Sequence, residues 1–405
     1  MVTSNKVNLQ EMNLQKILKV IVEERIVSRA DIAKKTNITP ATVSTLVQIL
    51  IDRKIAKMGN FASSTGGRRA VSIEIDNGSL YCLGVTVKKR MVTSAIVSLA
   101  GDVIARQENL YPVPSTTEKI LGTLVSSIDA LLEIAEQKKL KIIGIGVGVH
   151  GVVDYQNGIS VFAPAFQWKN IHIKKLLEEK YSYPILVDND VRVMVLAEKY
   201  LGKYRQLENF IFLSLDSGVG GGILINGKVL RGVSSAAGEI GHIRVQEQGY
   251  KCVCGNYGCL ETVASEVGLV RCALDEIKLG YPTLITEYIE NDDLSNVNFE
   301  VIYRAALAND ALALRILQKM GDYVGNALAD IVNMFNPEMI IIGGKISLAW
   351  DLFKDEIRKT VISQSMTECN EDVLIVKSSF DGAAGEIGAA ALVISDLFEK
   401  SLFND

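Results

Sequence analysis

The stretch GHIRVQEQGYKCVCGNYGCLE, residues 241–261, contains three of the chain's six cysteines and one of its three histidines. His242, Cys252, Cys254 and Cys259 form the pattern His-x9-Cys-x-Cys-x4-Cys. Thiolate and imidazole groups are the ligands that tetrahedral Zn²⁺ prefers, and four protein ligands leave no open coordination position. The segment therefore predicts one structural zinc ion per chain.

A disulfide or a redox centre explains this segment less well. Cys252 and Cys254 are too close in sequence for an easy disulfide, and their spacing is not the C-x-x-C of a thioredoxin-like site. The N-terminus lacks an apolar signal core, so we expect a cytoplasmic protein with reduced thiols. The longest apolar run, residues 142–153, is broken by glycines and predicts no membrane span. Three further cysteines have apolar neighbours and are predicted to be small core residues: Cys82, Cys272 and Cys369.

Charge is distributed unevenly along the chain of 405 residues, whose net charge is −4. Residues 1–75 contain 12 basic and 6 acidic residues, and the remainder contains 31 basic and 41 acidic residues. A basic N-terminal segment on an acidic body is the asymmetry expected where one end of a protein meets phosphate. Charge also fluctuates at random along a chain. The charge surplus alone therefore does not establish that this segment binds phosphate, and the local sequence pattern is needed as well.

The basic segment has the pattern of a helix-turn-helix. Ser28 is a suitable N-cap for a short helix, and Thr39 followed by Pro40 starts a second one after a tight turn. The second helix begins with small polar side chains, which suit the floor of a major groove. A helical bundle with a polar outer face is the plainer alternative. The residues predicted to contact DNA are Thr39, Ala41, Thr42, Ser44 and Thr45.

A β-hairpin, or wing, is predicted directly after these helices. Residues 55–58 and 70–75 are β-prone and flank a loop rich in glycine and serine. Arg68 and Arg69 lie in that loop beside two glycines. Arginine inserted into a narrow minor groove is a known mode of DNA recognition, so we predict that both contact DNA.

The body from Leu80 onward alternates strands and helices, and its pattern occurs twice. Glycines follow the buried strands in KIIGIGVGVHG, residues 141–151, and in EMIIIGGKIS, residues 338–347. The sequence therefore predicts two α/β lobes of similar plan. Ligands of such folds bind at the carboxyl ends of the strands.

The motifs of the body resemble one family closely. Four motifs occur in the order found in the ROK family of repressors and sugar kinases: VDNDVRVMVLAEKYLG, LSLDSGVGGGILINGKVLRG, SSAAGEIGHIRV with CVCGNYGCLE, and GAAGEIGAAAL. With the winged helix, the chain resembles the repressor branch, which includes xylose repressors. The resemblance implies an actin-like body with a sugar kinase/ribonuclease H-like fold, a structural zinc and a sugar in the cleft between two lobes. The expected domains are a winged helix-turn-helix at 1–75, lobe 1 at 76–195 with part of the helix 383–398, and lobe 2 at 196–405.

The resemblance also implies a set of sugar-binding residues. Carried over position by position, they are Gly151, Asn189, Asp190, Glu239, His242 and Glu261. Carboxylates and amides can pair with sugar hydroxyls, which both donate and accept hydrogen bonds. His242 would bind zinc through one ring nitrogen and a sugar hydroxyl through the other.

Two function classes compete for this body. Family members that phosphorylate sugars have D-x-G-G-T where this chain has Thr86-Val87-Lys88-Lys89-Arg90, so the acid and both glycines are missing. Glycine is needed where backbone approaches phosphate closely. We therefore expect a sugar-responsive repressor without kinase activity that binds an inverted repeat as a homodimer or tetramer. A sugar kinase with Asp190 as catalytic base, and a regulator controlled by a protein partner, are the alternatives.

Overall fold

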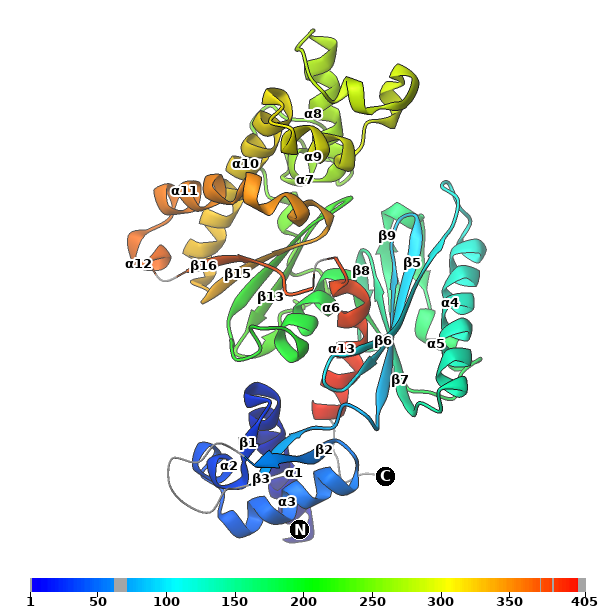
Figure 1. The fold of residues 1–405 in the computed structure, drawn as a ribbon, viewed down its shortest axis with the longest axis vertical. Coiled ribbons are helices and arrows are strands. Elements are labelled where there is room, and N and C mark those ends of the chain that lie inside the picture. Colours follow the sequence, from blue (N-terminus) through cyan, green and yellow to red (C-terminus); the bar gives the residue numbers. More distant parts are fainter. Residues whose placement is uncertain (1, 62–70, 372, 381, 400–405) are drawn as a thin grey trace. The chain divides into compact units, whose positions relative to one another are not determined.

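A computed structural model describes residues 2–61, 71–371, 373–380 and 382–399. The chain divides into two compact units (Figure 1). Unit 1 comprises Met1–Gln206 with Gly385–Asp405, and unit 2 comprises Leu207–Ala384. Among the described residues, no helix is both long and apolar enough to cross a membrane. The division into segments 1–75, 76–195 and 196–405 remains a prediction.

The N-terminal part of unit 1 consists of helices packed on a small antiparallel sheet of order β1-β3-β2. Its elements are α1 (Val2–Glu24), β1 (Val27–Ser28), α2 (Arg29–Thr36), α3 (Pro40–Asp52), β2 (Ala56–Phe61) and β3 (Val71–Ile75). Fully buried aliphatic side chains from all three helices form its core, including Leu14, Ile17, Ile32, Leu46 and Leu50. Burial of this apolar surface holds the short helices together.

Local capping fixes where α2 and α3 begin. The Ser28 hydroxyl accepts a hydrogen bond from the backbone N–H of Asp31 at 3.1 Å. Asn37 has a φ of 55° at the end of α2 and turns the chain. The Thr39 hydroxyl accepts from the backbone N–H of Thr42 at 3.4 Å, and proline occupies the first turn of α3. Both predicted helix starts are therefore confirmed, and so is the hairpin β2–β3. Two short helices joined by a turn and followed by an antiparallel strand pair are consistent with the helix-turn-helix and wing, which remain predictions.

The rest of unit 1 is built on a five-stranded sheet of order β11-β7-β4-β5-β6. Its strands are β4 (Tyr81–Val87), β5 (Met91–Ser98), β6 (Val103–Leu110), β7 (Ile142–Val149) and β11 (Ile185–Asn189). β4, β7 and β11 run parallel, whereas β5 and β6 are antiparallel to their neighbours. A separate three-stranded sheet has the order β10-β9-β8, formed by β8 (Val152–Asp154), β9 (Ile159–Ala163) and β10 (Trp168–Ile171).

Two helices cover opposite faces of the five-stranded sheet (Figure 1). α4 (Thr117–Gln137) packs its buried side chains on one face, and α13 (Ala384–Glu399) crosses the other. A Cβ on Gly84 would lie 1.8 Å from the backbone O of Glu386, and one on Gly146 would lie 1.8 Å from the backbone O of Ala389. These strand glycines therefore allow α13 to approach the sheet backbone directly. The remaining helices in the described part of unit 1 are the 3₁₀ helix η1 (Pro164–Phe166), α5 (Ile173–Glu178), α6 (Asp190–Leu196) and the π-helical turn η2 (Ala197–Leu201).

Contacts inside unit 1 join the end of η2 to the end of α1. A guanidinium N–H of Arg25 donates to the backbone O of Leu201 at 3.2 Å. Nε of Arg205 donates to the backbone O of Glu23 at 3.0 Å. α6 and η2 follow each other without a break, so the helix that begins after Asn189 ends beside the C-terminal end of α1.

Unit 2 repeats the sheet plan of unit 1. Its sheet has the order β14-β13-β12-β15-β16, with an antiparallel hairpin on one side and parallel strands on the other. The strands are β12 (Phe210–Leu215), β13 (Val219–Ile225), β14 (Lys228–Val229), β15 (Met339–Gly343) and β16 (Leu374–Lys377). Asn226 and Gly227 have φ values of 50° and 71°, as a tight hairpin turn requires. The predicted two α/β lobes of similar plan are confirmed.

Helices on this second sheet bury the largest core of the molecule. They are α7 (Glu261–Ala264), α8 (Glu266–Lys278), α9 (Phe299–Leu307), α10 (Ala311–Phe335), α11 (Lys354–Gln364) and α12 (Thr367–Asn370). Short 3₁₀ helices complete the unit: η3 (Ile240–His242), η4 (Thr286–Tyr288), η5 (Glu290–Asp292), η6 (Leu294–Asn296) and η7 (Lys345–Leu352). Cys272 and Cys369 pack against this core but are only half-buried. The prediction that they are core residues is therefore correct in position, but they are less buried than expected. Cys82 in unit 1 is fully buried, as predicted.

Candidate metal centre and ligand-binding residues

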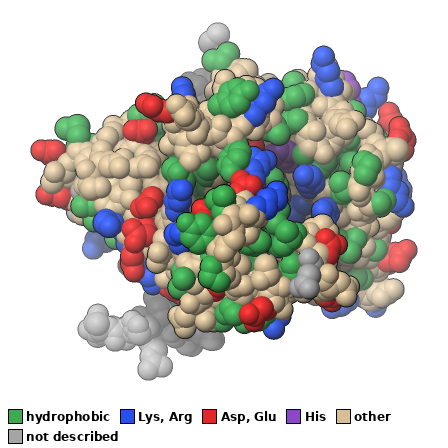
Figure 2. Space-filling view, turned by 90° about the horizontal axis from the view of Figure 1, so that it is seen from above, with side chains coloured by type: hydrophobic (Ala, Val, Ile, Leu, Met, Phe, Trp, Pro, Cys, Tyr) green, Lys and Arg blue, Asp and Glu red, His purple; other side chains and the backbone are tan. Residues whose placement is uncertain are grey.

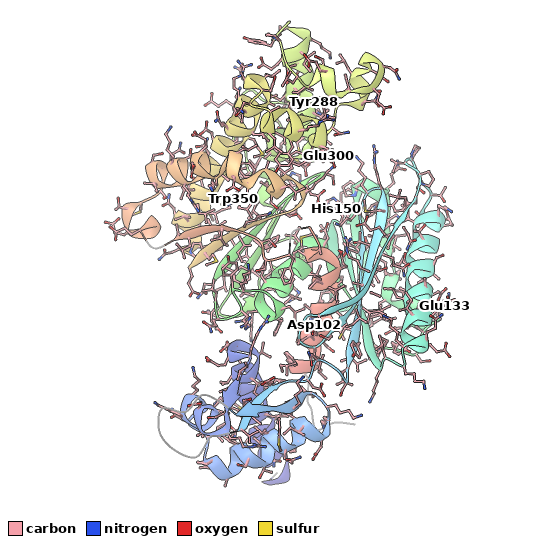
Figure 3. All side chains as sticks on the ribbon, in the orientation of Figure 1. Asp102, Glu133, His150, Tyr288, Glu300 and Trp350 are labelled. Atoms are coloured by element: carbon pink, nitrogen blue, oxygen red, sulfur yellow. The ribbon has the colours of Figure 1, made fainter. Side chains whose placement is uncertain are left out.

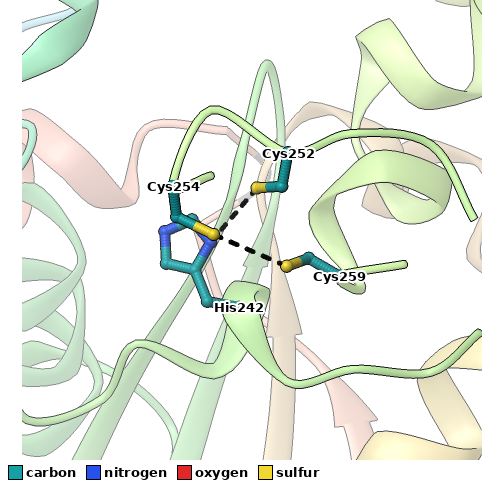
Figure 4. A group of neighbouring side chains, drawn as sticks. All are labelled: His242, Cys252, Cys254 and Cys259. Atoms are coloured by element: carbon teal, nitrogen blue, oxygen red, sulfur yellow. Dashed lines mark hydrogen bonds between the residues drawn. The ribbon is translucent and has the colours of Figure 1, made fainter. Parts of the chain in front are cut away.

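Four side chains of the segment 241–261 converge in unit 2 (Figure 4). One ligand atom from each of His242, Cys252, Cys254 and Cys259 lies within 4.8 Å of the other three. Cys254 Sγ and Cys259 Sγ are 3.7 Å apart, and Cys252 Sγ is 3.5 Å from His242 Nδ1. The four groups that the sequence pattern selected therefore form one cluster that could hold a metal ion.

The spacing of these atoms fits a tetrahedral zinc ion. With Zn–S near 2.3 Å and Zn–N near 2.05 Å, tetrahedral angles place two sulfurs about 3.8 Å apart and a sulfur and a nitrogen about 3.6 Å apart. The distances in the cluster, 3.7 Å and 3.5 Å, agree with both values. Three thiolates and an imidazole are also the donor set of structural zinc sites.

The backbone of the segment brings the ligands together. Isolated antiparallel bridges pair Arg244 with Cys259 and Lys251 with Tyr257, so the chain folds back on itself. The turn at Cys252 is closed by the N–H of Cys252 donating to the O of Asn256 at 2.7 Å. Gly255 and Gly258 have φ values of 96° and 72°, which residues other than glycine rarely adopt. These turns bring cysteines that are separated in sequence close together in space.

The three thiols differ in acidity without metal. Burial raises the pKa of the Cys252 thiol, and burial raises the pKa of Cys259 to about 12. The pKa of Cys254 is lowered, chiefly because the backbone N–H of Asn256 stabilises its thiolate. Metal binding needs all three as thiolates, so it would release protons from the two buried groups.

Glu239 and Glu261 lie directly beside this cluster. The second ring nitrogen of His242, Nε2, is 3.7 Å from Glu239 Oε2, and that glutamate is about half exposed. Glu261 Oε1 is 3.9 Å from Cys252 Sγ, and its other oxygen accepts from the backbone N–H of Val219 at 3.3 Å. The cluster therefore fixes the segment that presents both carboxylates. One ring nitrogen of His242 therefore lies in the cluster and the other faces Glu239, while its binding of zinc and of a sugar hydroxyl remains a prediction.

The predicted ligand residues of unit 1 lie at the carboxyl ends of β7 and β11. These strands are adjacent and parallel, and Val149 pairs with Asn189. The Asn189 amide donates to the backbone O of Gly151 at 2.9 Å and to Asp190 Oδ1 at 3.0 Å. Its oxygen accepts from two backbone N–H groups and caps α6. Asn189 thus positions Asp190 and the Gly151 loop, a role the sequence did not reveal.

Gly151 has a structural requirement of its own. Its φ is 95°, and a Cβ there would lie 2.3 Å from the backbone O of Phe162 and 2.9 Å from Ala163 Cα. Any side chain would force β9 away from the loop after β7. The glycine is therefore needed by the fold, independently of a bound ring.

The residues predicted to contact DNA lie at the start of α3. Thr39, Ala41, Ser44 and Thr45 are exposed, and Thr42 is half-buried beside the Thr39 hydroxyl at 2.9 Å. Two further predicted contacts, Arg68 and Arg69, lie outside the described residues.

Comparison with known proteins identifies the family of this chain. The ROK family matches over residues 82–396, which spans both α/β units. The chain belongs to the ROK family. A putative xylose repressor of Caldicellulosiruptor sp. (strain Rt8B.4) is 30% identical over 393 residues, covering 97% of this chain and 98% of that protein. The regulator NagC of Escherichia coli (strain K12) is 31% identical over 386 residues, 95% of this chain and 93% of NagC.

Solved ROK structures agree with this assignment. A ROK family transcriptional regulator described as a homologue of the E. coli MLC protein has a TM-score of 0.81 at 29% identity, covering 96% of this chain and 97% of that chain. A ROK family glucokinase from Streptomyces griseus, solved with glucose and AMPPNP, has a TM-score of 0.68 at 26% identity. It covers 77% of this chain and 98% of its own. The predicted ROK fold, with an actin-like sugar kinase body, is confirmed.

Proposed function

We propose that this ROK protein is a sugar-responsive transcriptional repressor of a carbohydrate-utilisation operon, with the sugar as inducer. The observation behind the proposal is that one chain combines the helices and antiparallel strand pair of residues 2–61 and 71–75 with the ROK body. A ROK regulator matches 96% of this chain, whereas the glucokinase matches 77% of it. Repressors of xylose and N-acetylglucosamine use match the chain over nearly its whole length.

DNA recognition is assigned to the first turns of α3. The hydroxyls of Ser44 and Thr45 donate to the backbone O atoms of Pro40 and Ala41, at 2.9 and 3.2 Å. Their oxygens keep lone pairs that can accept hydrogen bonds from base edges. Basic and acidic side chains are interspersed on the face in Figure 2, whereas residues 1–75 have a surplus of basic ones. A two-fold dimer or a tetramer on an inverted repeat is the expected assembly.

Arg68→Ala is expected to weaken operator binding and to lower the salt dependence of that binding by about one unit of slope, because one phosphate or groove contact is lost. Fluorescence anisotropy at several salt concentrations measures both quantities. Lys359→Ala, on α11 of unit 2, is the control for general loss of positive charge. Unchanged affinity and slope in Arg68→Ala would exclude the wing from the interface.

Six residues are proposed to contact the effector sugar. Gly151, Asn189 and Asp190 belong to unit 1, and Glu239, His242 and Glu261 belong to unit 2. The carboxylates accept hydrogen bonds from sugar hydroxyls, and their charge makes those bonds stronger than neutral ones. The metal is proposed to be one structural zinc per chain, which holds His242 and orients the carboxylates beside it.

A sugar kinase is the second candidate, because the glucokinase resembles the body and Asp190 corresponds to the base of such enzymes. Thr86, at the end of β4, is fully buried, and the turn Lys88–Arg90 follows it. Thr86 through Arg90 all have negative φ, so this turn lacks the glycine conformations of a phosphate-binding loop. Incubation with ATP and a panel of sugars, followed by detection of sugar phosphate, distinguishes the two functions. We expect no turnover.

A further inference from the structure

His150 lies beside the acidic residue assigned to the effector. It follows β7 directly and precedes Gly151 (Figure 3). His150 Nδ1 is 3.6 Å from Asp190 Oδ2, and the His150 side chain is 43% exposed. Both residues belong to unit 1, so this pair is formed within one compact body.

The two oxygens of the Asp190 carboxylate are in different situations. Oδ1 accepts from the Asn189 amide and from the backbone N–H of Val191, both at 3.0 Å. Oδ2 faces the His150 imidazole. The end of the carboxylate available to a ligand is therefore the end beside the histidine.

The gap between these two groups matches a hydroxyl. A separation of 3.6 Å is too long for a direct hydrogen bond. One oxygen atom can nevertheless lie about 2.8 Å from both atoms, which is an ordinary hydrogen-bond distance. A hydroxyl can donate its proton to Asp190 Oδ2 and accept the Nδ1–H of His150, because it is both donor and acceptor.

We propose that His150 and Asp190 together recognise one hydroxyl of the effector sugar, and that His150 is a specificity-determining residue. The inference rests on the proposed sugar site at Asp190. A sugar lacking that hydroxyl, or presenting it in the opposite configuration, forms neither of these two hydrogen bonds and binds more weakly.

Buried aromatic rings hold the imidazole in place. The rings of His150 and Phe166 are in a T-shaped arrangement, with a centroid distance of 6.3 Å and an interplanar angle of 81°. Phe166 in turn packs on Trp168, with centroids 4.9 Å apart. Both supporting side chains are at most 5% exposed. A ligand-binding group supported by buried rings is held in a defined direction, which selectivity between similar sugars requires.

The test compares the affinities of sugar analogues for the wild-type protein and for its variants. D-xylose, D-glucose and N-acetyl-D-glucosamine are titrated by calorimetry, followed by each monodeoxy analogue of the sugar that binds. Wild type is expected to bind one deoxy analogue at least tenfold more weakly than the parent. His150→Phe keeps the aromatic contact but removes the N–H. The ratio of the affinity for the parent sugar to that for this deoxy analogue should therefore fall at least threefold. His150→Gln retains a donor and should restore part of the ratio.

Three results separate the possible outcomes. His172→Phe, a change of the exposed histidine before α5, should bind all analogues as wild type does. If His150→Phe and His150→Gln keep the wild-type ratios while Asp190→Asn loses the sugar, the role of His150 is wrong and the sugar site stands. If no sugar of the panel binds, or Asp190→Asn binds as wild type does, the sugar site and the inference both fail. Circular dichroism identifies a variant that does not fold, and the other His150 variant then decides.

Discussion

Cys254→Ser is expected to reduce the metal content from about one zinc per chain to nearly none, because it removes one of four ligands from a closed site. The segment that presents Glu239 and Glu261 then loses its anchor. A loss of about 2 kcal/mol would lower the unfolding midpoint of a unit of this size by roughly 4–8 °C. The response to sugar should weaken with it. Elemental analysis of protein purified without chelators measures the metal, and calorimetry measures the midpoint.

Cys369→Ser is the matched control for this change. Cys369 is half-buried in unit 2 but lies outside the four-residue cluster, so its replacement should leave the zinc content at about one. Wild-type protein without metal, or Cys254→Ser with a full complement of zinc, would contradict the metal site.

Asp190→Asn is expected to raise the sugar concentration needed for release of DNA by about 10- to 100-fold. The substitution preserves the shape of the side chain but removes a charged acceptor, and a hydrogen bond to a charged group contributes about 1.5–3 kcal/mol. Operator binding without sugar should persist, because Asp190 is not among the residues predicted to contact DNA. Titration of sugar into the protein–DNA complex, followed by anisotropy, gives the half-effective concentration.

Asp129→Asn is the control for the loss of a carboxylate in the same unit. Asp129 on α4 accepts a hydrogen bond from the Tyr181 hydroxyl at 2.8 Å and lies outside the predicted ligand residues. Its variant should respond to sugar as wild type does. An Asp190→Asn protein that is induced at the wild-type sugar concentration would remove Asp190 from the effector site.

Local signals made the N-terminal segment and the metal cluster predictable. Ser28 and Thr39 cap helices through hydrogen bonds to residues three positions later, so their effect is contained in a few residues of sequence. The ligands of the cluster are also close in sequence, between His242 and Cys259. The repeated pattern of glycines after buried strands likewise predicted two lobes of one plan.

Features set by distant contacts were not predictable in this way. The π-helical turn at Ala197–Leu201 continues α6, and nothing in its local sequence distinguishes it from an ordinary helix. Residues 163–169 could not be placed from sequence, because β9 and β10 are short and their pairing depends on left-handed residues such as Gln167. The half-burial of Cys272 and Cys369 depends on how helices meet the core edge. The pairing of His150 with Asp190 joins strand ends 40 positions apart.

Operator affinity with and without sugar tests the central claim most directly. DNA duplexes that bind the full-length protein are selected from a random library, and the enriched duplex is titrated by anisotropy with each sugar of the panel. A sugar-responsive repressor predicts enrichment of an inverted repeat and tight binding that one sugar weakens at least tenfold, without consumption of ATP. Failure to enrich any sequence, or affinity for the enriched duplex that no sugar changes, would contradict it.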